Sequence, residues 1–220
     1  MDLICAIATP AAQTMANATH DIPIVGTAIT DYEGAKLVAS YEEPKGNVTG
    51  TSDMNPVKEQ IDLLLKIKPD AKTIGTVYCS SEVNSEVQVK AMKEYAESKG
   101  LTVKVATIST VNDIQQAAQS LVGSVDAFYE PTDNIIASAM PTLIDITNAA
   151  KIPVICGEPN MVKAGVQTGH MAADILEGKK PSSMPIEMAK DLKVTVNKAN
   201  AALLGITFPE DVLKDADVVE

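Results

Sequence analysis

Short apolar runs alternate along the chain with longer stretches in which apolar residues recur at helical spacing. The runs predicted as buried strands are Leu3–Ala8, Ile22–Val25, Thr73–Tyr78, Leu101–Ala106, Ala127–Tyr129, Pro153–Cys156 and Leu192–Val196. The stretches predicted as helices are residues 9–19, Asn55–Ile67, Glu82–Ser98, Val111–Val122, Asp133–Ala149, Val166–Leu176 and Ala199–Leu204. Strands that alternate with helices are typical of a parallel α/β sheet, so we expect three-layer, flavodoxin-like lobes.

Turn and cap residues refine this pattern. Thr9 is predicted as the N-cap of the first helix, with Pro10 as its first helical residue. Gly100 is predicted to close its helix in the left-handed conformation that only Gly adopts cheaply, and the last helix is predicted to end at Gly205. Residues Pro44–Asp53 are rich in Pro, Gly, Asn, Thr and Ser, and this composition predicts a crossover loop.

Composition narrows the classes of function. The 220 residues carry a formal net charge of −11, with 29 acidic residues against 18 basic ones, all of them Lys. A nucleic-acid-binding protein needs a basic stripe for phosphate contacts, so that class is disfavoured. Because Arg is absent, a bound anion has to be held by Lys, by hydroxyl groups or by backbone N–H groups.

Membrane and metal signals are weak. No apolar run approaches the roughly 18 residues of a membrane-spanning helix, and the N-terminus lacks the basic region of a signal peptide. The three cysteines form no Cys-x-x-Cys pair and lie far from both histidines in sequence, so we expect no metal site. Cys5 and Cys156 lie inside apolar runs and are predicted to be buried free thiols.

Polar residues follow five of the predicted strands. In an open parallel sheet, ligands bind beyond the carboxyl ends of the strands, where helix N-termini present free N–H groups. The segments at these positions are Thr9–Gln13, Thr30–Asp31, Ser80–Ser85, Glu130–Asn134 and Gly157–Asn160. They contain much of the chain's hydroxyl and Asx side chains at helix starts, and they are therefore the candidate binding site.

These segments supply what a zwitterion requires. Ser and Thr at helix N-termini can hold a carboxylate without Arg, and Glu82, Asp133 and Glu158 can hold an ammonium group. The same residue types are also the preferred helix N-caps, so each segment has a purely structural interpretation as well. That interpretation is weakest for Ser80–Ser85, because one N-cap explains one hydroxyl and not a run of polar side chains.

Several motifs resemble those of a known family. They are Ala6–Gln13, Thr27–Asp31, Gly46–Ser52, Pro131–Asn134 and Leu192–Gly205 with Pro209 after it. In these motifs the chain resembles the substrate-binding proteins of bacterial ABC transporters of the tryptophan/tyrosine (TrpX-like) type, which have the periplasmic-binding-protein type I fold. The resemblance covers nearly all of the chain.

The resemblance implies that two α/β lobes close over an amino acid, often an aromatic one, which a membrane permease then receives. It implies an extracytoplasmic protein, either periplasmic or a cell-surface lipoprotein, that is a binding component without cofactor and not an enzyme. The ligand-binding residues implied by the resemblance are Thr9, Gln13, Thr30 and Asp31 in the first lobe, and Ser80, Ser81, Glu82, Asn84, Ser85, Thr132, Asp133, Asn134 and Glu158 in the second.

The chain departs from the family pattern at two places. Family members carry further βαβ units before the position of Met1, and a tyrosine-containing strand after the position of Gly165. The first lobe (residues 1–40 and 166–185) is therefore expected to be incomplete, and the second (residues 41–165 and 186–220) to be well formed. Sheet edges left open by absent elements invite pairing between chains, so a homodimer is predicted.

Two alternatives stay open at this point. One is a flavodoxin-like fragment, truncated or engineered, without ligand function. The other is an amino-acid racemase of the two-thiol type, with Cys79 after a strand as the better thiol and Cys5 inside a strand as a poor partner.

Overall fold

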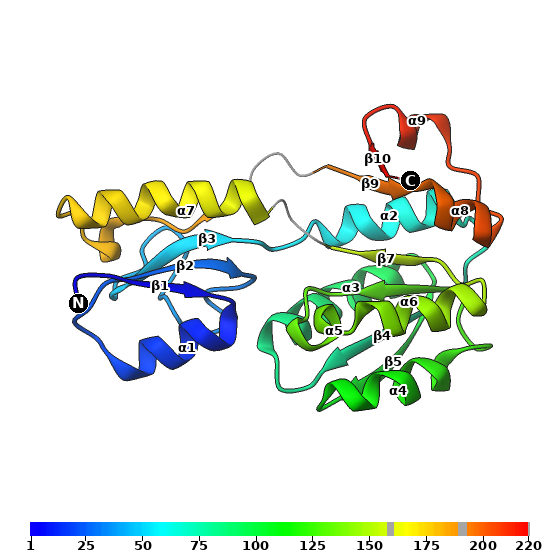
Figure 1. Cartoon of the computed structure of the whole chain (residues 1–220), viewed down its shortest axis with the longest axis horizontal. Helices are drawn as coiled ribbons and strands as arrows, with labels where there is room; N and C mark the ends of the chain where they lie inside the picture. Colours follow the sequence, from blue (N-terminus) through cyan, green and yellow to red (C-terminus); the bar gives the residue numbers. More distant parts are fainter. Residues whose placement is uncertain (158–160, 189–192, 220) are drawn as a thin grey trace. The chain divides into compact units, whose positions relative to one another are not determined.

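Parallel strands and their connecting helices account for most of the chain in the computed structural model, which describes residues 1–157, 161–188 and 193–219 (Figure 1). The strands are β1 (Ile4–Ile7), β2 (Ile24–Ile29), β3 (Val48–Ser52), β4 (Thr73–Cys79), β5 (Thr102–Ile108), β6 (Ala127–Glu130), β7 (Val154–Cys156), β8 (Glu187–Met188), β9 (Thr195–Asn197) and β10 (Asp217–Val219). The α-helices are α1 (Thr9–Ala18), α2 (Val57–Ile67), α3 (Val83–Ser98), α4 (Ile114–Leu121), α5 (Asn134–Ser138), α6 (Met140–Ala149), α7 (Met161–Leu176), α8 (Lys198–Leu204) and α9 (Glu210–Leu213). Short 3₁₀ turns lie at Val111–Asp113 and Pro181–Ser183.

The chain divides into two compact units. The first unit comprises Met1–Asn55, Glu82–Val87 and Glu158–Leu192, and the second comprises Pro56–Ser81, Gln88–Gly157 and Lys193–Glu220. The predicted ranges placed residues 41–55 in the second lobe, whereas β3 pairs with β2 and so lies in the sheet of the first unit. Whether the predicted ranges correspond to two ligand-binding lobes stays a prediction.

The first unit contains a parallel sheet in the order β1-β2-β3-β8. Helix α1 contacts β1 and β2 on one face, and α7 contacts β2 and β3 on the other (Figure 1). Ile24, Ile29 and Tyr32 are the largest fully buried side chains on the α1 side, and Val25 packs against Met171 of α7. Successive strand residues therefore serve opposite faces, as a sheet covered on both sides requires.

The second unit repeats this plan with a parallel sheet in the order β5-β4-β6-β7. Ile61 of α2 and Met92 of α3 pack with Tyr129 on one face. On the other face, Phe128 packs with Ile114 of α4 and Leu143 of α6. Both units are thus three-layer α/β structures, and the predicted fold class is confirmed.

Two predicted elements are wrong. Pro44–Asp53 was predicted as a loop, but it contains β3, because the Thr and Gly residues that suggested a loop fit a strand buried on both faces. The predicted helix Asp133–Ala149 is two helices, α5 and α6, with Ala139 between them. Pro141 has no N–H to donate to a continuous helix and instead lies in the first turn of α6.

Other local predictions are confirmed. Gly100 and Gly205 have φ values of 81° and 71°, in the left-handed region where each follows the end of a helix.

The last predicted strand begins later, at Thr195, and Leu192 lies outside the described residues. Helix α7 begins at Met161, five residues before its predicted start.

The burial predicted for two cysteines is wrong. The Cys5 and Cys156 side chains are exposed, and only Cys79 is buried. Cys5 lies in β1 and Cys156 in β7, and each of these strands is at the edge of its sheet. A residue of an edge strand has a neighbouring strand on one side only, so an apolar run does not guarantee burial there.

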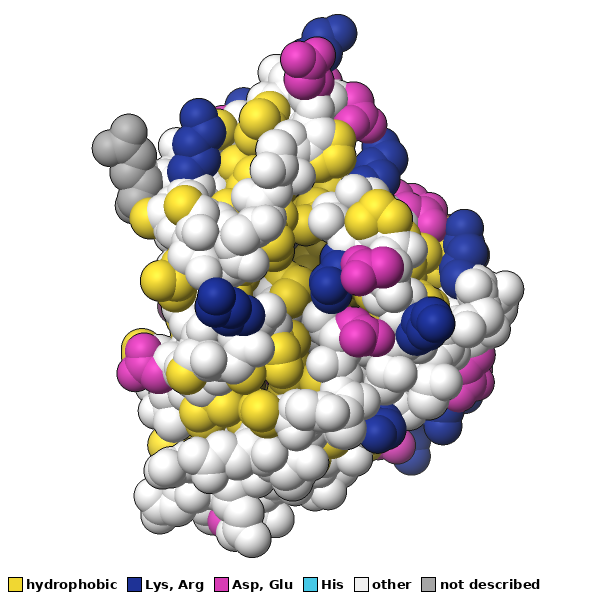
Figure 2. Space-filling view, turned by 90° about the vertical axis from the view of Figure 1, so that its right-hand side faces the viewer, with side chains coloured by type: hydrophobic (Ala, Val, Ile, Leu, Met, Phe, Trp, Pro, Cys, Tyr) yellow, Lys and Arg dark blue, Asp and Glu magenta, His cyan; other side chains and the backbone are white. Residues whose placement is uncertain are grey.

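Charged side chains of both signs are interspersed on the surface. Figure 2 shows one face, on which Lys and acidic side chains surround a band of hydrophobic ones. Lys66 Nζ lies 2.7 Å from Asp211 Oδ2 and joins α2 to α9, and Lys99 Nζ lies 3.1 Å from Asp62 Oδ1 between α3 and α2. Within the described ranges, none of the helices combines the length and the hydropathy needed to cross a bilayer.

Candidate functional site

Thr9 follows β1 as the first residue of α1, and it is not the N-cap that the sequence predicted. The N-cap is Ala8, with φ 74° and ψ 153°, a conformation that is strained for any residue except Gly. The Thr9 side chain is 2% exposed, and its Oγ1 has no hydrogen-bond partner among the described residues. The hydroxyl that was expected to cap the helix is therefore buried and forms no hydrogen bond with the described residues.

Thr30 and Asp31 follow β2, next to another irregular backbone. Ala28 has φ 55°, and the register between β2 and β3 shifts between Gly26 and Ile29. Thr30 is buried, and its carbonyl oxygen accepts a 2.7 Å hydrogen bond from Ser52 Oγ. A bulge of this kind redirects the side chains that follow it.

The Asp31 and Gln13 side chains are engaged in shaping one loop. Asp31 Oδ1 accepts hydrogen bonds from the amides of Glu33 and Gly34, at 3.1 and 3.0 Å. Gln13 Nε2 donates to the carbonyl oxygen of Ala35 at 3.2 Å. The structure thus shows both residues holding the turn after β2, and their role in ligand binding stays a prediction.

Asp53 also lies at the carboxyl end of a strand of the first sheet, and the sequence did not indicate it as a candidate site residue. It follows β3, a strand that was predicted as a loop, so nothing marked its carboxylate as lying at the end of a strand. The side chain is 1% exposed, and neither carboxylate oxygen has a hydrogen-bond partner among the described residues. Burial raises the pKa of Asp53, and the nearby Thr30 hydroxyl and its own backbone amide offset part of this rise.

In the second unit, Ser80 and Ser81 follow β4 as exposed residues. The Ser80 amide donates a 3.2 Å hydrogen bond to the carbonyl oxygen of Ile108, at the end of the neighbouring strand β5. Ser81 Oγ lies 3.2 Å from the sulfur of Cys79. Both hydroxyls therefore lie at the carboxyl edge of the second sheet, where the sequence predicted them.

The start of α3 carries buried polar side chains. Glu82, Asn84 and Ser85 are all buried, and Asn84 Nδ2 donates to Glu82 Oε2 at 2.9 Å and to Ser85 Oγ at 3.3 Å. Gln88, one turn after Asn84, is also buried, and its Oε1 accepts a 3.3 Å hydrogen bond from the amide of Thr132. Sequence reasoning missed Gln88, although a polar residue between Val87 and Val89 four positions after Asn84 was an available signal.

Asp133 is the N-cap of α5 and also accepts a hydrogen bond from the end of β4. Its Oδ1 accepts from the amides of Ile135 and Ile136, at 3.0 and 2.9 Å. Its Oδ2 accepts a 2.7 Å hydrogen bond from the amide of Cys79, at the end of β4. Thr132 beside it is partly buried and Asn134 is exposed, so the three residues predicted from this segment have three different environments.

Glu130, the last residue of β6, is an acid within the core of the second unit. Its side chain is 0% exposed, and Oε1 accepts one long hydrogen bond of 3.4 Å from the amide of Val77. Burial, and then the charge of Asp133, raise the pKa of Glu130 well above its usual value, with the Val77 amide offsetting part of the rise. Burial therefore favours the protonated form of the Glu130 carboxyl over the ionised form.

The remaining predicted site residue, Glu158, lies outside the described residues. In the part of the chain that the structure describes, no group of three or more His, Cys, Asp and Glu side chains could hold a metal ion. The described site thus consists of hydroxyl, amide and carboxylate groups at the carboxyl ends of strands in each unit.

Comparison with known proteins decides the family. The family model described as "ABC transporter substrate binding protein" matches residues 1–220. The chain belongs to this family. The family consists of substrate-binding proteins, so the racemase alternative is not favoured, and the burial of the Cys79 thiol also counts against it.

A curated relative is similar over most of the chain. A "Tyrosine-binding protein" from Clostridioides difficile (strain R20291) is 41% identical over 210 residues, which are 90% of this chain and 61% of that protein. The chain therefore spans about three fifths of the length of this curated relative.

Solved structures are similar as well. A structure described as the ABC domain in complex with L-Trp, from Streptococcus pneumonia, is 42% identical with a TM-score of 0.94, covering 99% of this chain and 79% of that one. A conserved domain protein from Vibrio cholerae is 39% identical with a TM-score of 0.96, covering 100% of this chain and 78% of that one. The periplasmic-binding-protein type I fold is thus shared.

Proposed function

We propose that this protein binds an amino acid with an aromatic side chain, such as L-tryptophan or L-tyrosine. The observation that carries the proposal is the similarity to a tyrosine-binding protein and to a structure in complex with L-Trp, each above 40% identity. The chemistry of the strand ends supports it, because hydroxyl and amide donors suit a ligand carboxylate and acidic side chains suit its ammonium group. In an arginine-free chain these groups take the place of a guanidinium clamp.

Isothermal titration calorimetry tests the proposal. We expect L-tryptophan or L-tyrosine to bind with a dissociation constant in the micromolar range or tighter, about −8 kcal/mol, and L-lysine to bind far more weakly. Thermal unfolding with and without ligand gives a second readout, because a ligand that binds only the folded state raises the melting temperature. An absence of heat and of thermal shift with every aromatic amino acid would instead support the fragment without ligand function.

We further propose that an ABC permease receives the ligand outside the cytoplasm, since proteins of this family typically work there. We propose in addition that a lipid anchor attaches the protein to the cell surface. Cross-linking on intact cells of the source organism tests both, with fractionation to locate the protein. We expect it in the extracytoplasmic fraction and cross-linked to a membrane permease. Recovery from the cytosol alone would contradict the proposal.

We also propose that the chain forms a homodimer through the edge of the first sheet. In β1, the edge strand, Ile7 is 65% exposed and Cys5 is exposed beside it. An uncovered edge with apolar side chains is a template for pairing with another chain. Light scattering after size exclusion should give a dimer for the wild type and a monomer for Ile7→Lys, and a monomeric wild type would contradict the proposal.

A further inference from the structure

Three oxygen atoms on buried side chains at the carboxyl edge of the first sheet have no hydrogen-bond partner among the described residues. They are Thr9 Oγ1 and the two carboxylate oxygens of Asp53, on side chains that are 2% and 1% exposed. The great majority of buried polar atoms in folded proteins are hydrogen-bonded, and a buried carboxylate is normally paired. Their position beyond the strand ends is where an open α/β sheet takes its ligand.

Among the described residues, no cationic side chain acts on the Asp53 carboxylate. The chain contains no Arg, and the groups that act on the Asp53 carboxyl are Thr30 and a backbone amide, with no Lys or His among them. The Lys ion pairs of the first unit, such as Lys45 with Glu43 and Lys179 with Asp174, lie between exposed side chains. An unpaired buried charge is expensive, so a positively charged ligand group would be strongly favoured there.

Backbone strain lies next to the same edge. Ala8, immediately before Thr9, has φ 74°, and Ala28, two residues before Thr30, has φ 55°. Such conformations are unfavourable in non-Gly residues, and they concentrate where a binding site imposes a geometry. Strain and unpaired polar groups therefore occur together at the ends of β1, β2 and β3.

Two other acids that follow strands, Asp31 and Asp133, differ from Asp53 in their partners. Asp31 accepts two backbone amides in its own turn, and Asp133 accepts three as a helix cap and strand bridge. These hydrogen bonds engage Oδ1 of Asp31 and both carboxylate oxygens of Asp133 within the fold. Neither carboxylate oxygen of Asp53 has a hydrogen-bond partner within the described ranges, and an ammonium group brings three N–H donors and a positive charge.

We propose that Asp53 binds the α-ammonium group of the amino-acid ligand in the first unit. The inference rests on the proposed function and adds to it the residue that selects a free α-amino group. A carboxylate as ligand group would be repelled by Asp53, so the ligand carboxylate is bound elsewhere, by hydroxyl and amide donors. Analogues that lack the amino group consequently lose the interaction with Asp53 and keep the others.

Calorimetry with Asp53→Asn tests the inference, using L-tryptophan and indole-3-propionate, which lacks the ammonium group. A hydrogen bond to a charged group is stronger than one between neutral groups, so we expect the variant to bind L-tryptophan at least about tenfold more weakly than the wild type. Its affinity for indole-3-propionate should stay within about twofold of the wild-type value. Equal losses for both ligands, or no loss for L-tryptophan, would overturn the inference.

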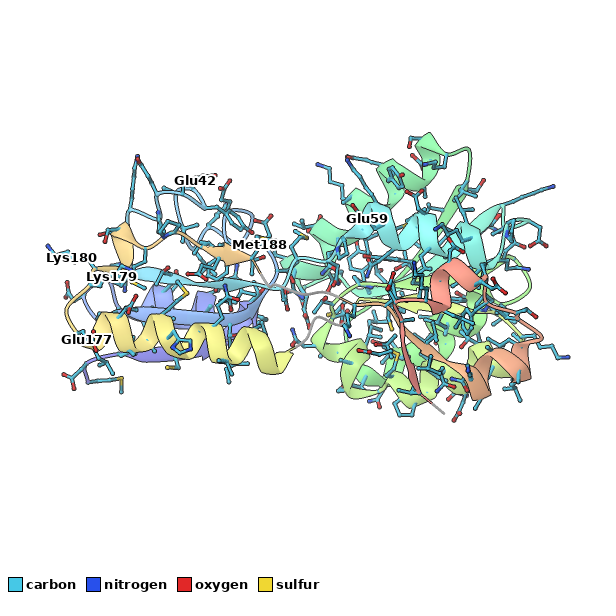
Figure 3. All side chains as sticks on the ribbon, turned by 90° about the horizontal axis from the view of Figure 1, so that it is seen from above. Glu42, Glu59, Glu177, Lys179, Lys180 and Met188 are labelled. Atoms are coloured by element: carbon cyan, nitrogen blue, oxygen red, sulfur yellow. The ribbon has the colours of Figure 1, made fainter. Side chains whose placement is uncertain are left out.

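Thermal unfolding of the ligand-free protein separates binding from folding. Because Asn removes a buried unpaired charge, the variant should unfold at the same temperature as the wild type or higher. Glu42→Gln is the matched control, since Glu42 is an exposed acid of the first unit (Figure 3), and it should change neither affinity nor stability. A lower melting temperature for Asp53→Asn would show a structural role and overturn the inference.

A second neutral variant, Asp53→Ser, repeats the measurement if the Asn variant does not fold. The two failures are distinguishable, because the wild type is titrated first. If the wild-type chain binds neither L-tryptophan nor L-tyrosine, the proposed function fails and the inference fails with it. If the wild type binds and both neutral variants bind equally well, the inference alone fails.

Discussion

Gly50 in β3 shows how a single residue allows two strands to pack around a tyrosine. Its φ is 152°, and a Cβ at this position would lie 2.1 Å from the carbonyl oxygen of Gly26 and 2.4 Å from the hydroxyl oxygen of Tyr32. Tyr32 is fully buried and donates its hydroxyl to the carbonyl oxygen of Thr51 at 3.1 Å. The tyrosine therefore occupies the space that a side chain at position 50 would need.

We expect Gly50→Ala to destabilise the protein by about 3 kcal/mol or more, because the strained φ and the overlap with backbone atoms act together. Gly46→Ala is the matched control, since a Cβ there meets no atom within 4 Å. Its stability should change by no more than about 0.5 kcal/mol. Urea unfolding of both variants measures the difference, and equal stabilities would show that β2 and β3 separate easily.

At the scale of elements, the N-cap residue of α5, Asp133, also forms a hydrogen bond to the end of β4 in the second sheet. Helix α5 has five residues, too short to be stable alone, so its formation depends on contacts outside itself. Asp133 supplies them by accepting two amides of α5 and the amide of Cys79 in β4. The end of β4 and the start of α5 are therefore fixed by one carboxylate.

Asp133→Ala should cost about 2–4 kcal/mol, the sum of a lost N-cap and a buried amide left without an acceptor. Asn197→Ala is the matched comparison, because Asn197 caps α8 through a single hydrogen bond to the amide of Asn200. That variant should cost about 1 kcal/mol. Chemical denaturation without ligand measures both, and an equal cost would argue that the Cys79 bridge contributes nothing.

At the scale of the whole molecule, buried and surface acids give stability opposite dependences on pH. The Lys72 amide, more than any other group, holds the pKa of Asp126 below its usual value, so this interaction stabilises the fold above about pH 4 and is lost in acid. Glu130 has a raised pKa, so the folded state keeps a proton that the unfolded chain releases above about pH 4.5. Stability from Glu130 is therefore fully present in acid and declines as pH rises toward its folded pKa.

Glu130→Gln should remove this decline while preserving the shape of the side chain. We expect the variant and the wild type to have similar free energies of unfolding at about pH 4, with the variant gaining relative stability toward about pH 8. Guanidinium unfolding across this range measures the difference, with exposed Glu59→Gln as the control. A difference that stays constant with pH would mean that Glu130 is ionised in the folded protein.

Sequence reasoning identified most of the elements, and its choice of ligand-binding residues stays a prediction. The (αβ) alternation from residue 56 onward was visible because each element buries one face with its own periodicity. Strand β3 was missed because its Thr, Gly and Ser residues have the composition of a loop and are buried only by neighbouring strands. Asp53 was missed for the same reason, because only residues that follow a recognised strand were considered as candidates for the binding site.

The sequence alone determined the α/β class, the acidic charge, the absence of Arg and the polar residues at strand ends, because these depend on composition and on short-range periodicity. Only the tertiary structure decided which carboxylates have partners. The Asp133 carboxylate accepts a hydrogen bond from an amide 54 residues away, at Cys79, whereas the buried Asp53 carboxylate has no hydrogen-bond partner among the described residues. Hydrogen-bond partners and burial come from residues distant along the chain, and no local pattern of amino acids encodes them.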